Sequence, residues 1–300
     1  MFDHILVPLD GSGLAEAAIT PAVVLSKQLG SQITLLHVIE KNAPQEIHGQ
    51  RHLTTESEAL AYLDRIKDGY LQDPRDVRIH VHTEESSAVA KSIVDHSEEY
   101  KPDLIILSAH GEGGLRDIVI GSIPQQVISA GSIPVLLLQP QTGNEYREIK
   151  FRRFLVPLDD DREHEFSLTV AADLALKTGA SLHLVTIIPT LASLNREEAM
   201  TAALLPISTN AILDITEENA CEALEKKVPA LEARGLKVSV EVERGDPAGK
   251  VIESSLREHV DLIVLSTHQK KGLEAFWAGS VAPNIVSHTQ LPLLLLPIHK

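Results

Sequence analysis

The sequence contains an internal repeat, and a repeat of this length constrains the fold more than any other feature of the chain. Four segments recur in the same order, and the later matches are offset by nine residues more than the first. The matched pairs are Leu6-Val-Pro-Leu-Asp10 with Leu155-Val-Pro-Leu-Asp159, Asp103-Leu-Ile-Ile-Leu-Ser108 with Asp261-Leu-Ile-Val-Leu-Ser266, Gly121-Ser122 with Gly279-Ser280, and Pro134-Val-Leu-Leu-Leu138 with Pro292-Leu-Leu-Leu-Leu296. We therefore expect two copies of one domain, over residues 1–142 and 150–300, with a short linker between them and a net insertion near residues 190–209.

Within the first copy, short apolar runs alternate with stretches of helical length. Strands are expected at residues 5–9, 32–38, 77–81, 104–107 and 135–138. Helices are expected at residues 15–29, 55–71, 88–99 and 122–129. Such alternation gives right-handed crossovers and a parallel sheet, so the fold class is α/β with two tandem doubly wound domains.

Composition narrows the class of partner. Acidic residues outnumber basic ones by 42 to 27, and the net charge of −15 disfavours binding to nucleic acid or to an anionic membrane. The chain has one cysteine, Cys221, and no apolar stretch of 18 residues, so neither an intrachain disulfide nor a membrane span is expected. We expect a cytoplasmic protein.

The candidate binding residues follow the first and fourth strands, because ligands of open parallel sheets bind beyond the carboxyl ends of the strands. Pro8-Leu-Asp10-Gly11-Ser12 follows the first strand. Ser108-Ala-His110-Gly111 follows the fourth, and after nine residues Gly121-Ser122 begins the next helix. Glycines allow close approach of backbone amides, and a helix amino terminus attracts anions, so this combination suits a phosphate group.

In these motifs the sequence resembles the universal stress proteins. The ATP-binding members of that family carry Gly, two residues, Gly, nine residues, Gly and then Ser or Thr, after a first strand that ends in Pro-x-Asp. The resemblance covers both copies. It implies a five-stranded sheet in the order 3-2-1-4-5 in each domain, ATP with Mg²⁺ as the ligand, dimerisation through strand 5, and a regulatory role in the stress response.

The resemblance also assigns roles to individual residues. It implies that Pro8, Leu9 and Asp10 contact the adenosine, with Asp10 on the sugar or base, and that the Val38 backbone faces the adenine. Leu107, Ser108, His110 and Gly111 would line the ribose and phosphates, and Gly121, Ser122 and Ile123 would hold the phosphates. The sequence departs from the family at Ser108, where the first glycine is expected. A serine adds a small side chain there and keeps the backbone amide.

The second copy departs further from the pattern. Gln269 replaces the glycine expected at the tight approach, and Asp160 and Asp161 add negative charge after its first strand. Both changes oppose an anionic ligand. We therefore expect nucleotide to bind mainly to the first copy and the second copy to be structural.

Simpler interpretations remain for several of these residues. Gly111 and Gly121 also suit tight turns and helix packing, and Asp10 and Asp159 are also suited to capping a helix. The spacing of His48 with His52, and of His80 with His82, would put each pair on one face of a helix or strand. Because neither pair has a cysteine or carboxylate in a tetrahedral ligand pattern, surface or packing roles are favoured over a metal site.

No catalytic motif is found: the sequence has no Gly-x-Ser-x-Gly, no Walker-type Gly-Lys-Ser/Thr and no His-Glu-x-x-His. We therefore expect a binding protein and not an enzyme, with slow ATP hydrolysis left open. The alternative function is a nucleotide-free interaction scaffold in which both sites have degenerated. The apolar runs 135–138 and 293–296 would be sheet edges, and we expect them to pair with each other or with another chain as a homodimer.

Overall fold

The computed structural model describes residues 1–44, 46–47, 50–70, 77–86, 88–109, 121–139, 150–159, 164–191, 193, 200, 204–268 and 281–298. By their contacts these residues form two compact units, each described by itself. The first consists of residues 1–149, 267–278 and 290–300, and the second of residues 150–266 and 279–289.

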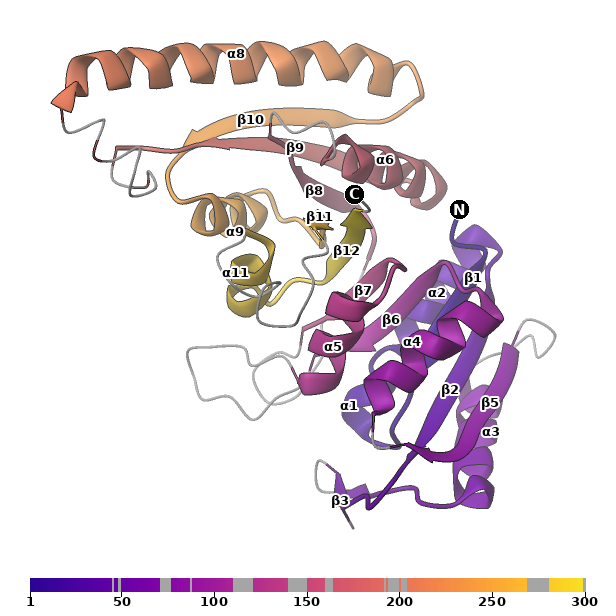
Figure 1. The fold of residues 1–300 in the computed structure, drawn as a ribbon. Coiled ribbons are helices and arrows are strands. Elements are labelled where there is room, and N and C mark those ends of the chain that lie inside the picture. Colours follow the sequence, from indigo (N-terminus) through magenta and orange to yellow (C-terminus); the bar gives the residue numbers. More distant parts are fainter. Residues whose placement is uncertain are drawn as a thin grey trace. The chain divides into compact units, whose positions relative to one another are not determined.

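The first unit is a mostly parallel sheet with helices on both faces (Figure 1). Its elements in chain order are β1 (His4–Pro8), α1 (Gly13–Glu16), α2 (Ile19–Leu29), β2 (Gln32–Glu40), β3 (Glu46–Ile47), β4 (Gln50–Arg51), α3 (Glu56–Tyr70), β5 (Val77–Ser86), α4 (Val89–Tyr100), β6 (Leu104–Ser108), α5 (Ser122–Ala130), β7 (Val135–Leu138) and β12 (Leu293–Ile298). Helix α4 packs beside α5, and α2 packs beside α3. The strand order β5-β2-β1-β6-β7 confirms the predicted order 3-2-1-4-5.

Strand β12, from the end of the sequence, completes the sheet of the first unit. It pairs antiparallel with β7, with Leu293 opposite Leu137 and Leu294 opposite Leu136. Both strands are buried on both faces, which explains why each is a continuous apolar run rather than an alternating one. The prediction that these two runs pair with each other is therefore confirmed.

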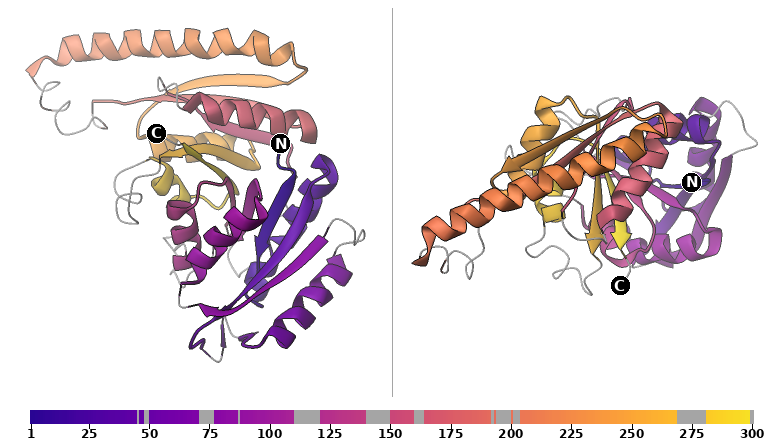
Figure 2. Two further views of the ribbon diagram at one scale, coloured as in Figure 1. Left: turned by 45° about the vertical axis from the view of Figure 1, so that its right-hand side comes forward. Right: turned by 90° about the horizontal axis from the view of Figure 1, so that it is seen from above.

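The elements of the second unit repeat the arrangement of the first unit as far as the fourth strand. They are β8 (Arg153–Pro157), α6 (Glu165–Thr178), β9 (Ser181–Ile188), α8 (Pro206–Glu232), β10 (Val238–Arg244), α9 (Pro247–Arg257), β11 (Leu262–His268) and α11 (Val281–His288), with strand order β10-β9-β8-β11. Helix α8 has 27 residues where the corresponding α3 has 15, and it packs along β10 (Figures 1 and 2). The net insertion of the second copy therefore includes additional helix.

The sequence predicts one helix over residues 15–29, but the structure has two helices there. Helix α1 ends at Glu16 and α2 begins at Ile19. Pro21 explains the division, because proline has no backbone N–H to donate to the preceding turn and is tolerated only in the first turn of a helix. Helix α2 then ends at Leu29, and its C-cap is Gly30, whose φ of 75° is a left-handed conformation that glycine adopts without strain.

Candidate functional site

A pocket lies at the carboxyl ends of β1, β2 and β6 in the first unit. Here the winding of the sheet reverses, because β2 lies on one side of β1 and β6 lies on the other. The pocket is open to solvent, and the space between its atoms is about 650 Å³ when the solvent at its mouth is included. Its lining residues are Pro8, Leu9, Asp10, Ala15, Leu36, His37, Val38, Glu40, His52, Val89, Ile93, Leu107, Ser108, Ile123 and Pro124.

The structure brings most of the predicted binding residues together in this pocket. Those that line it are Pro8, Leu9, Asp10, Val38, Leu107, Ser108 and Ile123. Gly121 and Ser122 do not line it: Gly121 is the N-cap of α5, Ser122 is the first residue of that helix, and Ile123 and Pro124 follow them into the wall. His110 and Gly111 lie outside the described residues.

The turn after β1 is held by its own side chains. The Asp10 carboxylate accepts a hydrogen bond from the backbone N–H of Ser12 at 2.8 Å. Ser12, and not Asp10, is the N-cap of α1, because its hydroxyl oxygen accepts from the Ala15 N–H at 3.2 Å. Gly11 has a φ of 92°, and a Cβ there would lie 3.0 Å from the Leu53 side chain. The turn therefore requires glycine at this position and presents the Asp10 side chain to the pocket.

Three buried polar atoms of the pocket wall have no hydrogen-bond partner among the described residues. They are the Ser108 hydroxyl, His37 Nε2 and His52 Nδ1, and all three side chains are at least nine-tenths buried. Leaving such atoms unpaired costs about 1–3 kcal/mol each, so buried polar groups normally have a partner. Their shared position in one pocket indicates that a polar ligand or ordered water satisfies them.

The hydrogen bonds of His37 show which of its ring nitrogens carries the proton. Nδ1 lies 2.8 Å from the Leu9 carbonyl oxygen, and because a carbonyl only accepts, Nδ1 donates. Burial lowers the pKa of His37 against the opposing effect of that carbonyl and the nearby Leu53 carbonyl. The ring is therefore neutral at pH 7, and Nε2 presents a lone pair that accepts a hydrogen bond.

The sequence interpretation missed the polar residues His37, Glu40 and His52. His37 and Glu40 belong to β2, which is buried on both faces over most of its length, so no alternation in the sequence separates pocket-facing residues from the rest. His52 follows β4, and its Nε2 lies 4.0 Å from the Glu40 carboxylate. Residues 50–51 form a strand, and His48 lies outside the description, so the spacing of His48 with His52 is not tested.

The corresponding site of the second copy falls mostly outside the described residues. Asp159, the equivalent of Asp10, lies 2.6 Å from Nδ1 of His164. Asp160, Asp161, Gln269, Gly279 and Ser280 are not described. The loss of nucleotide binding by the second copy therefore stays a prediction.

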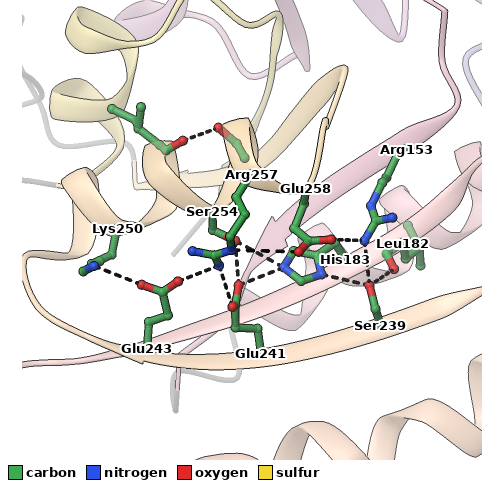
Figure 3. Close-up of polar contacts among 12 residues, drawn as sticks. Arg153, Leu182, His183, Ser239, Glu241, Glu243, Lys250, Ser254, Arg257 and Glu258 are labelled. Atoms are coloured by element: carbon green, nitrogen blue, oxygen red, sulfur yellow. Dashed lines mark hydrogen bonds and ion pairs between the residues drawn. The ribbon is translucent and has the colours of Figure 1, made fainter.

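The second unit instead contains a polar network between its sheet and α9 (Figure 3). Its members are Arg153, His183, Ser239, Glu241, Glu243, Lys250, Ser254, Arg257 and Glu258. Burial raises the pKa of Glu241, but hydrogen bonds from Ser254, His183 and Arg257 outweigh it and hold that pKa below its usual value.

Serine, histidine and carboxylate meet in this network, but the arrangement does not suit catalysis. The Ser254 hydroxyl donates to Glu241 at 2.8 Å, and the side chain is completely buried. Arg257 binds Glu241 at 2.5 Å and Glu243 at 2.6 Å. Because a nucleophile must reach its substrate and these groups satisfy one another, we interpret the network as structural.

Comparison with known proteins agrees with this architecture. The family model described as the universal stress protein family matches residues 1–139 and 150–297. Universal stress protein MJ0531 of Methanocaldococcus jannaschii is 34% identical over 85 residues, which are 28% of this chain and 50% of that protein. Universal stress protein Sll1654 of Synechocystis is 33% identical over 139 residues, 46% of this chain and 86% of that protein.

Among solved structures, a functionally unknown protein, PA1789 of Pseudomonas aeruginosa, superposes with a TM-score of 0.68 and 18% identity. The match covers 99% of this chain and 93% of that one, so it shows the tandem fold. None of the described helices combines the length and apolar character that a membrane span requires. Because the family model matches both repeats, the chain belongs to the universal stress protein family.

Proposed function

We propose that the first unit binds ATP, with Mg²⁺, in the pocket at the carboxyl ends of β1, β2 and β6. In this proposal nucleotide occupancy is the signal of a stress-response regulatory module, and the second copy is structural. The single observation that carries the proposal is the set of unpaired buried polar atoms in this pocket, at Ser108, His37 and His52.

The pocket residues suit the parts of ATP in a definite order. Apolar side chains from β2 and α4 would enclose the adenine, with Val38 and Ile93 among them. The Nε2 lone pair of His37 would accept a hydrogen bond from the exocyclic amino group of adenine, which a guanine base lacks at that position. This pairing predicts a preference for ATP over GTP.

The other end of the pocket suits a ribose and a phosphate chain. The Asp10 carboxylate would accept hydrogen bonds from the ribose hydroxyls. Ser108 and the first turn of α5 would face the phosphates, where the partial positive charge of a helix amino terminus favours anions. Phosphate binding here is local, so the net charge of −15 does not oppose it.

Calorimetric titration of the full chain with ATP and Mg²⁺ tests the proposal, with Asp10→Asn as the variant. Asparagine still accepts the Ser12 N–H and keeps the turn, but loses the charge, so we expect ATP affinity to fall about tenfold. Asp159→Asn is the matched control in the second copy, and it should leave the affinity unchanged. Equal losses in the two variants would contradict binding mainly by the first copy.

Two further measurements separate this proposal from its alternatives. No heat of binding at millimolar ATP would favour the nucleotide-free scaffold. Phosphate release from bound ATP at the background rate is expected if occupancy is the signal, whereas rapid turnover would show an enzyme.

A further inference from the structure

Three histidines of the first unit converge at a place separate from the pocket. His80 and His82 are two residues apart on β5, so they point to the same face of the sheet. His96 comes from α4, which packs on β2 and β5. One ring nitrogen from each histidine lies within 4.8 Å of the other two. The His96 side chain is buried, and the other two are partly buried.

The hydrogen bonds of His96 leave one of its nitrogens as a ligand atom. Nδ1 lies 2.7 Å from the Ser92 carbonyl oxygen, which only accepts, so Nδ1 carries the proton. Nε2 of the neutral ring therefore has a lone pair, and it lies 3.0 Å from Nε2 of His80. A backbone carbonyl that fixes the tautomer of a histidine is the usual support of a metal-binding imidazole.

His80 has a similar support on its other nitrogen. Its Nδ1 lies 2.9 Å from the Tyr100 hydroxyl, which both donates and accepts. Without a cation, His80 Nε2 donates its proton to His96 Nε2 and Tyr100 donates to Nδ1. With a cation, the His80 proton moves to Nδ1 and is donated to Tyr100, and two lone pairs then face the same point.

Burial and the charges around the cluster disfavour a second proton on the His80 ring, and a neutral ring can bind a metal cation. Burial lowers the pKa of His80, and the neighbouring rings of His96 and His82 lower it further, while the Glu99 carboxylate opposes them. The His80 ring is therefore a neutral ligand near pH 7. Burial and the Glu99 carboxylate raise the pKa of Tyr100, and the positive charge of Arg78, on the same strand as His80, opposes them.

We propose that His80, His82 and His96 form a binding site for a divalent transition-metal ion, with Zn²⁺ as the probe that defines it. Imidazole nitrogens bind Zn²⁺ at about 2.0–2.1 Å, which in a tetrahedral site places them roughly 3.3 Å apart. The His80–His96 separation of 3.0 Å already approaches this value, and rotation of the partly exposed His82 ring brings in the third ligand. Three histidines leave a fourth position for water. The ion would tie the edge strand β5 to α4.

Titration calorimetry of the full chain with Zn²⁺, without nucleotide and without a polyhistidine tag, tests the proposal. A Cys221→Ser background removes the exposed thiol as a competing ligand. We expect one ion per chain, and His82→Gln and His96→Gln should each weaken binding at least about tenfold. His288→Gln is the control, because His288 is an exposed histidine at the end of α11, and its binding should match the background protein.

Two spectroscopic readouts keep the test independent of folding. Co²⁺ bound in place of Zn²⁺ should give the intense visible absorption of a tetrahedral site in the background protein and not in His82→Gln. The imidazole nitrogen shifts of His80 should show the proton moving from Nε2 to Nδ1 as Zn²⁺ is added. Zn²⁺ affinities of all variants within twofold of the background protein would overturn the proposal, and so would an unchanged His80 tautomer at saturation.

Discussion

The two units place different chemistry at the same position of one fold. In each unit, the proline of the matched Leu-Val-Pro-Leu-Asp segment lies opposite a residue of the neighbouring strand, and that residue lies opposite one on the strand beyond it. The residues in line are Pro8, Leu36 and His80 in the first unit and Pro157, Val185 and Glu241 in the second. Two residues farther along, His82 corresponds to Glu243. The histidine cluster of the first unit therefore occupies the position of the carboxylates in the second unit.

The helix that packs on this position, α4 in the first unit and α9 in the second, also carries different residues in the two units. His96 and Ser254 each lie seven residues before the aspartate of the next matched segment, Asp103 or Asp261. By the same count Glu99 stands where the second unit has Arg257. The second unit thus pairs carboxylates on the strand with an arginine on the helix, and the first unit pairs imidazoles with an acidic residue. One duplicated position carries an ion-pair network in one unit and three converging imidazole rings in the other.

Transferring the second unit's carboxylates into the first should have the largest effect. His80→Glu with His82→Glu would place two like charges beside Glu99, with no arginine on α4 to balance them, and we expect the free energy of unfolding to fall by roughly 3 kcal/mol. Adding Glu99→Arg should restore about half of that loss. Chemical denaturation followed by circular dichroism measures the total, and hydrogen exchange of the β5 amides assigns it to the first unit. A double variant as stable as the wild type would show that histidines and carboxylates are interchangeable at these positions.

Breaking the network of the second unit should have an intermediate effect. Glu241→Gln keeps the size of the side chain but weakens its bonds to Arg257, His183 and Ser254, so we expect a loss of about 2 kcal/mol of stability. Glu222→Gln is the control, because its ion pair with Lys226 on α8 is exposed and should be worth less than about 0.5 kcal/mol. Similar losses in both variants would contradict a structural role for the network.

Lowering the pH should have the smallest effect on the free energy of unfolding, and this effect should come from the first unit. His4 corresponds to Arg153 by register, and burial lowers the pKa of His4, with Arg78 acting in the same direction and the Tyr100 carbonyl opposing it. The unfolded chain, with a histidine pKa near 6.5, takes up the proton first, so stability falls as the pH drops below about 6.5.

His4→Gln should remove part of this pH dependence, by up to about 1 kcal/mol between pH 7 and pH 5, because glutamine does not titrate. Denaturation curves of both proteins across that pH range measure the difference. Identical slopes would exclude His4 as a source of the acid sensitivity.

The fold was predictable from the sequence because its strands are apolar runs with little ambiguity. The run at residues 104–107 lies in β6, and the run at 135–138 coincides with β7. The extra length of α8 was less accessible: the repeat offset shows that residues were inserted, and a Pro-interrupted segment indicates a loop rather than the helix that follows it. Helix length there depends on packing against β10, which the sequence does not display.

The candidate site was predictable only in part. Asp10, Val38 and Ser108 follow motifs of the family, so the resemblance located them, and all three line the pocket. His96 illustrates the limit, because 14 residues separate it from His82 and only the packing of α4 on the sheet brings the two rings together. Two histidines on one strand indicate a candidate site only when the third is known, and no spacing in the sequence identifies the third.

The antiparallel ladder between β7 and β12 has a consequence for biosynthesis. β7 ends at residue 138, but its antiparallel partner, β12, begins only at residue 293. During translation of the intervening residues β7 has β6 on one side only, so its other edge is an unpaired apolar edge, which is a template for association with other chains. The first unit can complete its sheet only after residues 293–298 have been synthesised.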